Sequence, residues 1–227
     1  MYSLTFYKGS GTEHKDTFAD WFLVPASRPV VLPPSVKTAM IDIPGSNGQI
    51  DLTETLNGYV NYGPRTGSWN FYVLNDRTPE IAWFDLYSEI LNFLHGQRVK
   101  VYFNEENDYY YLGRVSVNEW ASDPSYSRIT LSYSLDPYKY YKNFTRNNVI
   151  VSGSTSYNLN MAFDMPVVPT IEVENNTGNV SITFEGKQYE VGEGTHKIPS
   201  IVLKKGNNLF GFNGSATVQI TYQGGKL

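Results

Sequence analysis

Most of the chain alternates apolar and polar residues, a pattern that is typical of β-strands. Four segments place an apolar side chain at every second position: residues 69–73, 98–103, 128–135 and 216–222. A period of two puts one face of a strand on a core and the other face in water. The pattern therefore predicts antiparallel strands in a chain that is mainly β.

Turn residues lie between these strands. Residues 104–108 (Asn-Glu-Glu-Asn-Asp) are expected to form the polar tip of an extended hairpin made by strands 98–103 and 109–119. Residues 44–48 predict a tight turn, because Gly and Asn accept positive φ, and residues 175–179 are expected to join two paired strands in the same way. The outer edge of the extended hairpin needs a cover, and a neighbouring copy of the chain is the cover we expect.

One segment has a helical period instead. Thr78 is a suitable N-cap, Pro79 suits the first helical position and Gly96 suits the stop, so a helix is predicted from about Pro79 to Leu94. Its expected apolar stripe, with residues three or four apart, comprises Trp83, Tyr87, Ile90 and Leu94, joined by Phe84 and Leu91. We expect this stripe to pack on a sheet.

The composition changes near residue 142. Of the 18 basic and 22 acidic residues, 12 and 16 precede the change (net −4), which leaves 6 and 6 after it (net 0), and all four tryptophans also precede it. Two domains are therefore predicted. Residues 1–142 should form an antiparallel β-sandwich with one packed helix and the extended hairpin, and residues 143–227 a small β-sandwich.

Composition and charge exclude several function classes. A net charge of −4 over 227 residues gives no basic field for nucleic acid, and the absence of cysteine removes thiolate metal sites and a Cys nucleophile. Residues 1–8 lack the pattern of a secretory signal, and the apolar stretch 81–94 is too short to cross a bilayer. We therefore expect a protein that is not secreted, with no membrane or nucleic-acid partner.

No catalytic or metal-binding pattern is recognisable. There is no G-x-S-x-G motif, the three histidines are far apart, and Glu105, Glu106 and Asp108 lack the spacing of a calcium loop. Pairs among the 22 acidic residues could serve a glycosidase, and the sequence does not decide this. The expectation is a protein that is no enzyme and has no cofactor.

Tyrosine is concentrated at two places, and five of these residues are candidates for a subunit interface: Tyr109, Tyr110, Tyr111, Tyr138 and Tyr140. Rings with a polar end are enriched at protein interfaces and also form platforms for sugars. The other interpretation is that an exposed sheet face simply favours aromatic residues. All three interpretations remain open.

The order of several segments resembles a known family. The segments are Ile-Asp-Ile-Pro-Gly-Ser-Asn-Gly-Gln-Ile-Asp-Leu-Thr (41–53), the aromatic strand 69–74, the helix end Leu-Asn-Phe-Leu-His-Gly (91–96), Tyr-Tyr-Tyr-Leu-Gly-Arg-Val (109–115), Leu-Asp-Pro-Tyr-Lys-Tyr (135–140) and Ile-Thr-Tyr-Gln-Gly-Gly (220–225). Together they resemble the distal tail proteins of long, non-contractile-tailed bacteriophages and of related prophages of Gram-positive hosts.

This resemblance implies a structural role in the virion. It implies a hexameric ring at the tip of the tail tube, made by the first domain, with a galectin-like or jelly-roll second domain facing outward. The expected partners are the chain itself, the tail tube protein, the tail-tip (tail-associated) protein and receptor-binding or baseplate proteins. Such a protein is made in the host cytoplasm. The alternative function is a carbohydrate-binding adhesin module that recognises bacterial wall polysaccharide.

Overall fold

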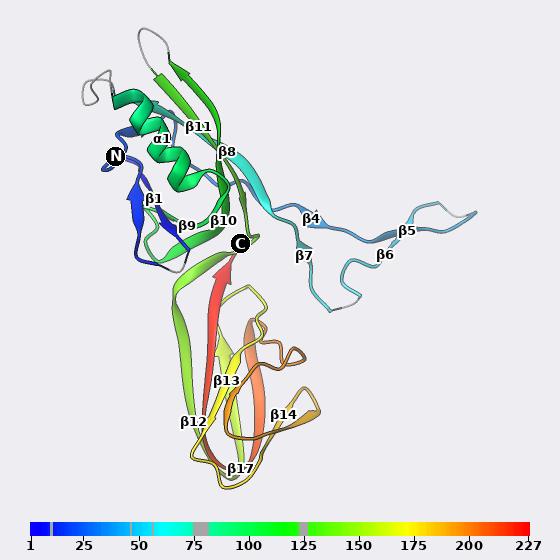
Figure 1. Cartoon of the computed structure of the whole chain (residues 1–227). Coiled ribbons are helices and arrows are strands. Elements are labelled where there is room, and N and C mark those ends of the chain that lie inside the picture. Colours follow the sequence, from blue (N-terminus) through cyan, green and yellow to red (C-terminus); the bar gives the residue numbers. More distant parts are fainter. Residues whose placement is uncertain (10, 46, 56, 75–81, 123–126) are drawn as a thin grey trace. The chain divides into compact units, whose positions relative to one another are not determined.

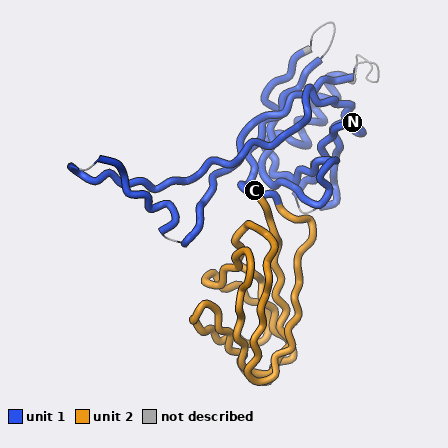
Figure 2. The backbone as a smooth tube through the Cα atoms, turned by 180° about the vertical axis from the view of Figure 1, so that it is seen from behind, with its two compact units in different colours: residues 1–139 blue, residues 140–227 orange. Residues whose placement is uncertain are grey.

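The computed structural model describes residues 1–9, 11–45, 47–55, 57–74, 82–122 and 127–227. The chain divides into two compact units, Met1–Lys139 and Tyr140–Leu227 (Figure 2). The buried apolar residues form two clusters, one in each unit. The division lies three residues before the boundary that the composition indicates after residue 142, inside a long strand, Lys139–Met161. Independent folding of the two parts stays a prediction.

Unit 1 is built on an antiparallel sheet with strand order β2-β1-β9-β10-β11-β8-β3. The strands are β1 (Leu4–Lys8), β2 (His14–Asp16), β3 (Leu23–Pro25), β8 (Arg65–Val73), β9 (Gln97–Phe103), β10 (Tyr109–Ser122) and β11 (Ser127–Leu135). The inward positions of β8 and β11 alternate strictly with outward ones, which confirms the strand pattern expected there. Figure 1 labels β1, β8, β9, β10 and β11 beside the single labelled helix.

A short link joins the two edges of this sheet. Residues 17–22 run from β2 at one edge to β3 at the other, and the Leu23 amide donates a hydrogen bond to the Thr17 carbonyl over 2.7 Å. The link carries Trp21, which is fully buried and packs its ring 6.2 Å from that of Phe6. The sheet therefore curls around one aromatic core.

The helix α1 (Ala82–Leu94) packs on this core. Ile90 and Leu94 are fully buried, as the sequence predicts, but Phe84 is 74% exposed and does not belong to the stripe. Leu86 and Phe93 are buried in its place. The predicted first residues, Thr78 to Glu80, lie outside the described residues.

Glu89 ties the exposed side of α1 to the rest of unit 1. Its carboxylate accepts a hydrogen bond from Lys15 Nζ at 2.8 Å and one from Trp21 Nε1 at 3.2 Å. The bond from Lys15 holds the pKa of the Glu89 carboxyl below its usual value. The pair therefore connects the helix, strand β2 and the link that carries Trp21.

The extended hairpin β9–β10 forms in the expected place, with Val101 opposite Tyr111. The expectation that a neighbouring copy covers its edge is wrong, because β1 pairs along β9 from Leu4 to Lys8 and β11 pairs along β10. The residues at its tip are also engaged within the chain. Glu105 accepts a hydrogen bond from Arg28 at 3.0 Å, and Glu106 forms an ion pair with Lys139.

Two long strands organise unit 2. β12 (Lys139–Met161) and β17 (Gly206–Lys226) are neighbours, and each has a glycine with positive φ near its middle, Gly153 (φ 67°) and Gly214 (φ 140°). The first half of β17 pairs with β14 (Val180–Phe184), and the second half pairs with β13 (Thr170–Glu174). The glycines allow the backbone to bend, so the two strands contribute to two sheets.

The outer strands complete these sheets. β15 (Lys187–Val191) pairs with β14, and β16 (Gly194–His196) pairs with β13. The expectation that residues 175–179 join two strands paired with each other is therefore wrong, since β13 and β14 pair with different halves of β17. The predicted fold class, mainly antiparallel β with a packed helix and a second β-sandwich, is confirmed.

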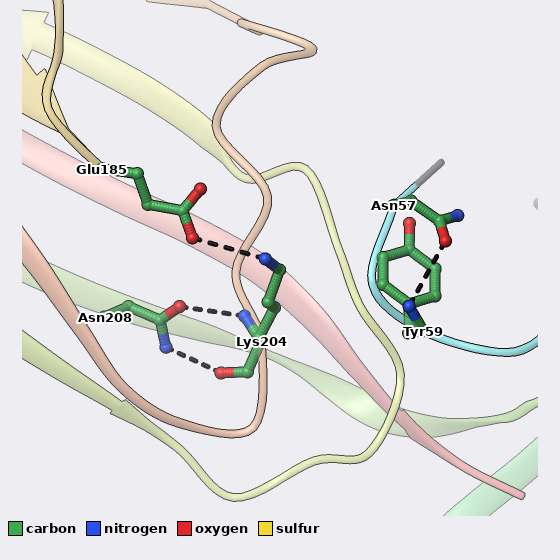
Figure 3. A network of polar contacts seen from close by, with 5 residues as sticks. All are labelled: Asn57, Tyr59, Glu185, Lys204 and Asn208. Carbon is green, nitrogen blue, oxygen red and sulfur yellow. Dashed lines mark hydrogen bonds and ion pairs between the residues drawn. The ribbon is translucent and has the colours of Figure 1, made fainter. Parts of the chain in front are cut away.

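A buried amide fixes the chain before β17 (Figure 3). Asn208 is 6% exposed, its Oδ1 accepts from the Lys204 amide at 2.9 Å, and its Nδ2 donates to the Lys204 carbonyl at 2.8 Å. The same Nδ2 contacts the Leu159 carbonyl of β12 at 3.3 Å. Asn208 therefore holds both the entry of β17 and the end of β12.

Candidate assembly interface

A ribbon of four short strands extends from unit 1 (Figure 1), and we call residues 30–62 the arm. β4 (Val36–Lys37) pairs with β7 (Asn61–Tyr62), and β5 (Met40–Asp42) pairs with β6 (Gln49–Asp51). The turn between β5 and β6 contains Gly45 and Gly48, both at positive φ, as the sequence predicts. Among the described residues, these four strands pair only with one another.

The arm exposes aliphatic side chains. Seven of them are between 41% and 58% exposed: Val30, Leu32, Val36, Met40, Ile41, Ile43 and Ile50. Ile41 and Ile50 lie directly opposite each other on β5 and β6. A two-stranded ribbon is marginally stable in water by itself, and a concentration of exposed apolar residues marks an interaction surface. The arm is therefore the best candidate for a surface that another chain covers.

The base of the arm is fixed by polar contacts to unit 1. Arg65 is 5% exposed, and its guanidinium donates to the Leu32 carbonyl at 3.0 Å and to the Pro137 carbonyl at 2.7 Å. Burial lowers the pKa of Arg65 from its ordinary value. Two further hydrogen bonds hold the base, from Trp69 Nε1 to the Val30 carbonyl at 2.8 Å and from the Leu32 amide to the Tyr133 hydroxyl at 3.1 Å.

Of the five candidate tyrosines, the three on β10 do not share one face. Tyr110 is 5% exposed, and its ring lies 5.3 Å from that of Tyr102. Tyr111 points to the opposite side of the strand and packs on Phe103, and burial raises the pKa of its hydroxyl. Tyr109 is half-buried, with Lys139 Nζ 5.1 Å from its ring centre. Tyr110 therefore offers a partner almost no surface.

Tyr138 and Tyr140 are both half-buried. Tyr138 places its ring 5.9 Å from that of Tyr62, edge to face, and so touches the end of the arm. Tyr140 begins unit 2. The structure thus brings Tyr138 to the arm, leaves Tyr109 and Tyr111 on one face of β10 and buries Tyr110 on the other. The arm aliphatics and Arg65 were not predicted as site residues, although the alternation Ile41-Asp42-Ile43 could have indicated them.

The described part of the chain holds no group of three or more His, Cys, Asp or Glu side chains that could bind a metal ion. Within the same residues, no helix is long and apolar enough to span a membrane. His14 stacks on Tyr7 with ring centres 4.8 Å apart, and His196 Nε2 lies 2.9 Å from the Gly192 carbonyl. Both histidines therefore have structural contacts.

The fold is similar to that of a phage protein of known structure. No family model matches the sequence, and no curated protein matches it. A solved structure that matches is the crystal structure of the SPP1 Dit protein (gp 19.1), described as a paradigm of the hub adsorption apparatus in phages that infect Gram-positive hosts. The similarity has a TM-score of 0.64 at 15% identity and covers 98% of this chain and 99% of that one. It includes both units.

Proposed function

We propose that this chain is a structural protein of a phage tail tip, and that six copies form a ring that joins the tail tube to the tail-tip and host-adhesion proteins. The observation that carries the proposal is the arm, whose seven aliphatic side chains remain between 41% and 58% exposed in the described part of the chain. The similarity in fold to the hub protein Dit, over nearly the whole length of both chains, supports the same role.

We infer a ring from the form of the arm. Its apolar residues and the body of unit 1 are different surfaces, so an arm that packs on the body of the next copy makes a head-to-tail contact. Repetition of one such contact closes a ring when the rotation between copies fits. The number six comes from the resemblance to distal tail proteins.

The candidate tyrosines fit this ring unequally. Tyr138 lies against Tyr62 of the arm, so it would border the contact, and the half-buried rings of Tyr109 and Tyr140 would add contact area. Tyr110 and Tyr111 would instead support the strand from within the chain. The interface we propose therefore centres on the aliphatic arm, with tyrosines at its border.

The proposed partners are the chain itself, the tail tube protein, the tail-tip protein and receptor-binding or baseplate proteins, all in the virion. The protein would be made in the host cytoplasm, would catalyse no reaction and would need no cofactor. The alternative function, an adhesin for wall polysaccharide, would use the candidate interface tyrosines as platforms for sugars.

Native mass spectrometry of the full chain over a range of concentrations tests the proposal. We expect monomer and hexamer, with the hexamer increasing as the concentration rises. Two results would contradict a head-to-tail ring. One is a protein that stays monomeric at the highest concentration. The other is a closed two-fold dimer in which the arm is protected from proteolysis.

A further inference from the structure

Three asparagine residues are followed directly by glycine: Asn47, Asn57 and Asn213. In such a pair the backbone nitrogen of the glycine can attack the side-chain amide of the asparagine, because the glycine has no Cβ that hinders the approach. The reaction in a folded protein also requires freedom of that part of the backbone. The three sites should therefore differ with their surroundings.

At Asn57 hydrogen bonds hold the backbone and the side chain (Figure 3). The Gly58 amide donates to the Glu54 carbonyl at 2.8 Å, so the nitrogen that would attack is engaged. The Asn57 side chain is half-buried, its Oδ1 accepts from the Tyr59 amide at 3.3 Å, and its Nδ2 lies 3.3 Å from Asn61 Oδ1. Both reacting groups at Asn57 are therefore fixed.

At Asn213 a paired strand holds the backbone. Asn213 of β17 lies opposite Ser181 of β14, and the preceding residue, Phe212, is 2% exposed in the core of unit 2. A Cβ placed on Gly214 would lie 3.3 Å from the Asn179 carbonyl oxygen, so this glycine has little space around it. A reaction at Asn213 would first require β17 to open.

Asn47 lies in a different setting, in the turn at the tip of the arm. Asn47 and Gly48 are both exposed and belong to no strand. Gly48 has φ 95°, and a Cβ placed on it would meet no described atom within 4 Å apart from its chain neighbours. The ribbon behind the turn has only the three residue pairs of β5 and β6, and such a ribbon is marginally stable. The turn can therefore open at low cost in free energy.

We propose that Asn47 is a site of spontaneous deamidation, and that the fold protects Asn57 and Asn213. The Gly48 backbone nitrogen attacks the side-chain carbonyl carbon of Asn47, and a C–N bond forms. The side-chain amide nitrogen leaves as ammonia and takes the proton of the Gly48 amide with it. Water then opens the cyclic imide at either carbonyl group, which gives aspartate or isoaspartate. No oxidant, reductant or cofactor takes part.

Either product changes the tip of the arm. Both add a negative charge to an arm that already carries Asp42 and Asp51, and isoaspartate also inserts an extra atom into the main chain. The length of the turn fixes the register of a hairpin, so isoaspartate should misalign Ile41 and Ile50 across β5 and β6. The reaction itself does not depend on the proposed ring.

Peptide mapping by mass spectrometry tests this inference on the full chain, after the folded protein has been kept in mildly alkaline buffer. Asn47 and Asn57 share the tryptic peptide 38–65, so fragment ions that distinguish asparagine, aspartate and isoaspartate assign the site. We expect Asn47 to react at least about ten-fold faster than Asn57 and Asn213, because the other two need a held backbone to open first. In urea, where the fold is lost, the three rates should become similar.

The matched control is Asn47→Gln, which keeps an amide in the same turn on a side chain that forms the cyclic imide poorly. It should show no conversion at this position and unchanged rates at Asn57 and Asn213. The inference is overturned if Asn47 of the folded protein reacts no faster than Asn57 or Asn213, or if urea accelerates all three equally. Native mass spectrometry measures the assembly of the ring and not this reaction, so the two proposals fail separately.

Discussion

The arm gives the sharpest prediction, through the pair Ile41 and Ile50. These residues lie opposite each other and are 52% and 46% exposed, so about half of each side chain remains to be buried by a partner. Complete burial of an isoleucine contributes about 1.5–3 kcal/mol, so the remaining half contributes about 1 kcal/mol per residue. The double change Ile41→Ser and Ile50→Ser should therefore cost about 2 kcal/mol per contact between subunits, or roughly a 30-fold weaker contact.

Every contact in a closed ring carries both substitutions, so they should weaken assembly of the whole ring by a larger factor than they weaken one contact. The assay is the concentration at half-assembly, from light scattering on a sizing column. The control is Leu209→Ser, which removes a 64% exposed aliphatic residue from unit 2 and should leave assembly unchanged. The melting temperature of dilute protein should change little, because neither isoleucine belongs to a core cluster. Unchanged assembly of the double variant, or an equal loss in the control, would refute the reasoning.

Three further predictions concern unit 1. Ile90→Ala should lower the free energy of unfolding by about 2–5 kcal/mol, because the side chain is fully buried. Phe84→Ala, on the exposed side of α1, should lower it little. Chemical denaturation measures both values. Glu89 has a lowered pKa in the folded state, so its contribution to stability is present above the ordinary pKa of 4.5 and is lost as the pH falls through the lower folded value. The difference in melting temperature between the parent protein and Glu89→Gln should therefore disappear in acid. A difference that stays constant with pH would contradict the ion pair with Lys15. Arg65→Lys replaces the planar guanidinium, whose Nε and Nη1 donate to two different carbonyl groups at the base of the arm, with a single ammonium. Limited proteolysis should therefore cut the arm faster than in the parent protein, and equal rates would show that this guanidinium does not hold the arm.

Local patterns in the sequence were sufficient for elements whose partners are near in the chain. The hairpin β9–β10 and the turn at residues 44–48 follow from alternation and turn residues. Pairings between distant segments were not predictable in this way. The cover of β9 is β1, about 90 residues earlier, and the partners of β13 and β14 are the two halves of one later strand.

Periodicity also cannot tell which chain buries an apolar residue. Ile41 and Ile50 have the alternation of core strands, yet the structure leaves them half-exposed on the arm. On α1, Phe84 and Leu86 are both apolar and two residues apart, and only the position of the sheet decides that Leu86 faces the core. The tyrosines of β10 are adjacent in sequence, which indicates one aromatic surface, but adjacent residues of a strand point to opposite faces.

In the proposed six-membered ring, the arm of one copy packs on unit 1 of the next. Electron cryomicroscopy of the full chain at the concentration of maximal assembly tests it most directly. We predict closed six-fold rings in which Ile41 and Ile50 of each arm are covered by the neighbouring subunit. Particles without six-fold symmetry, or six-fold rings in which the arms extend freely into solvent, would contradict this packing of the arm.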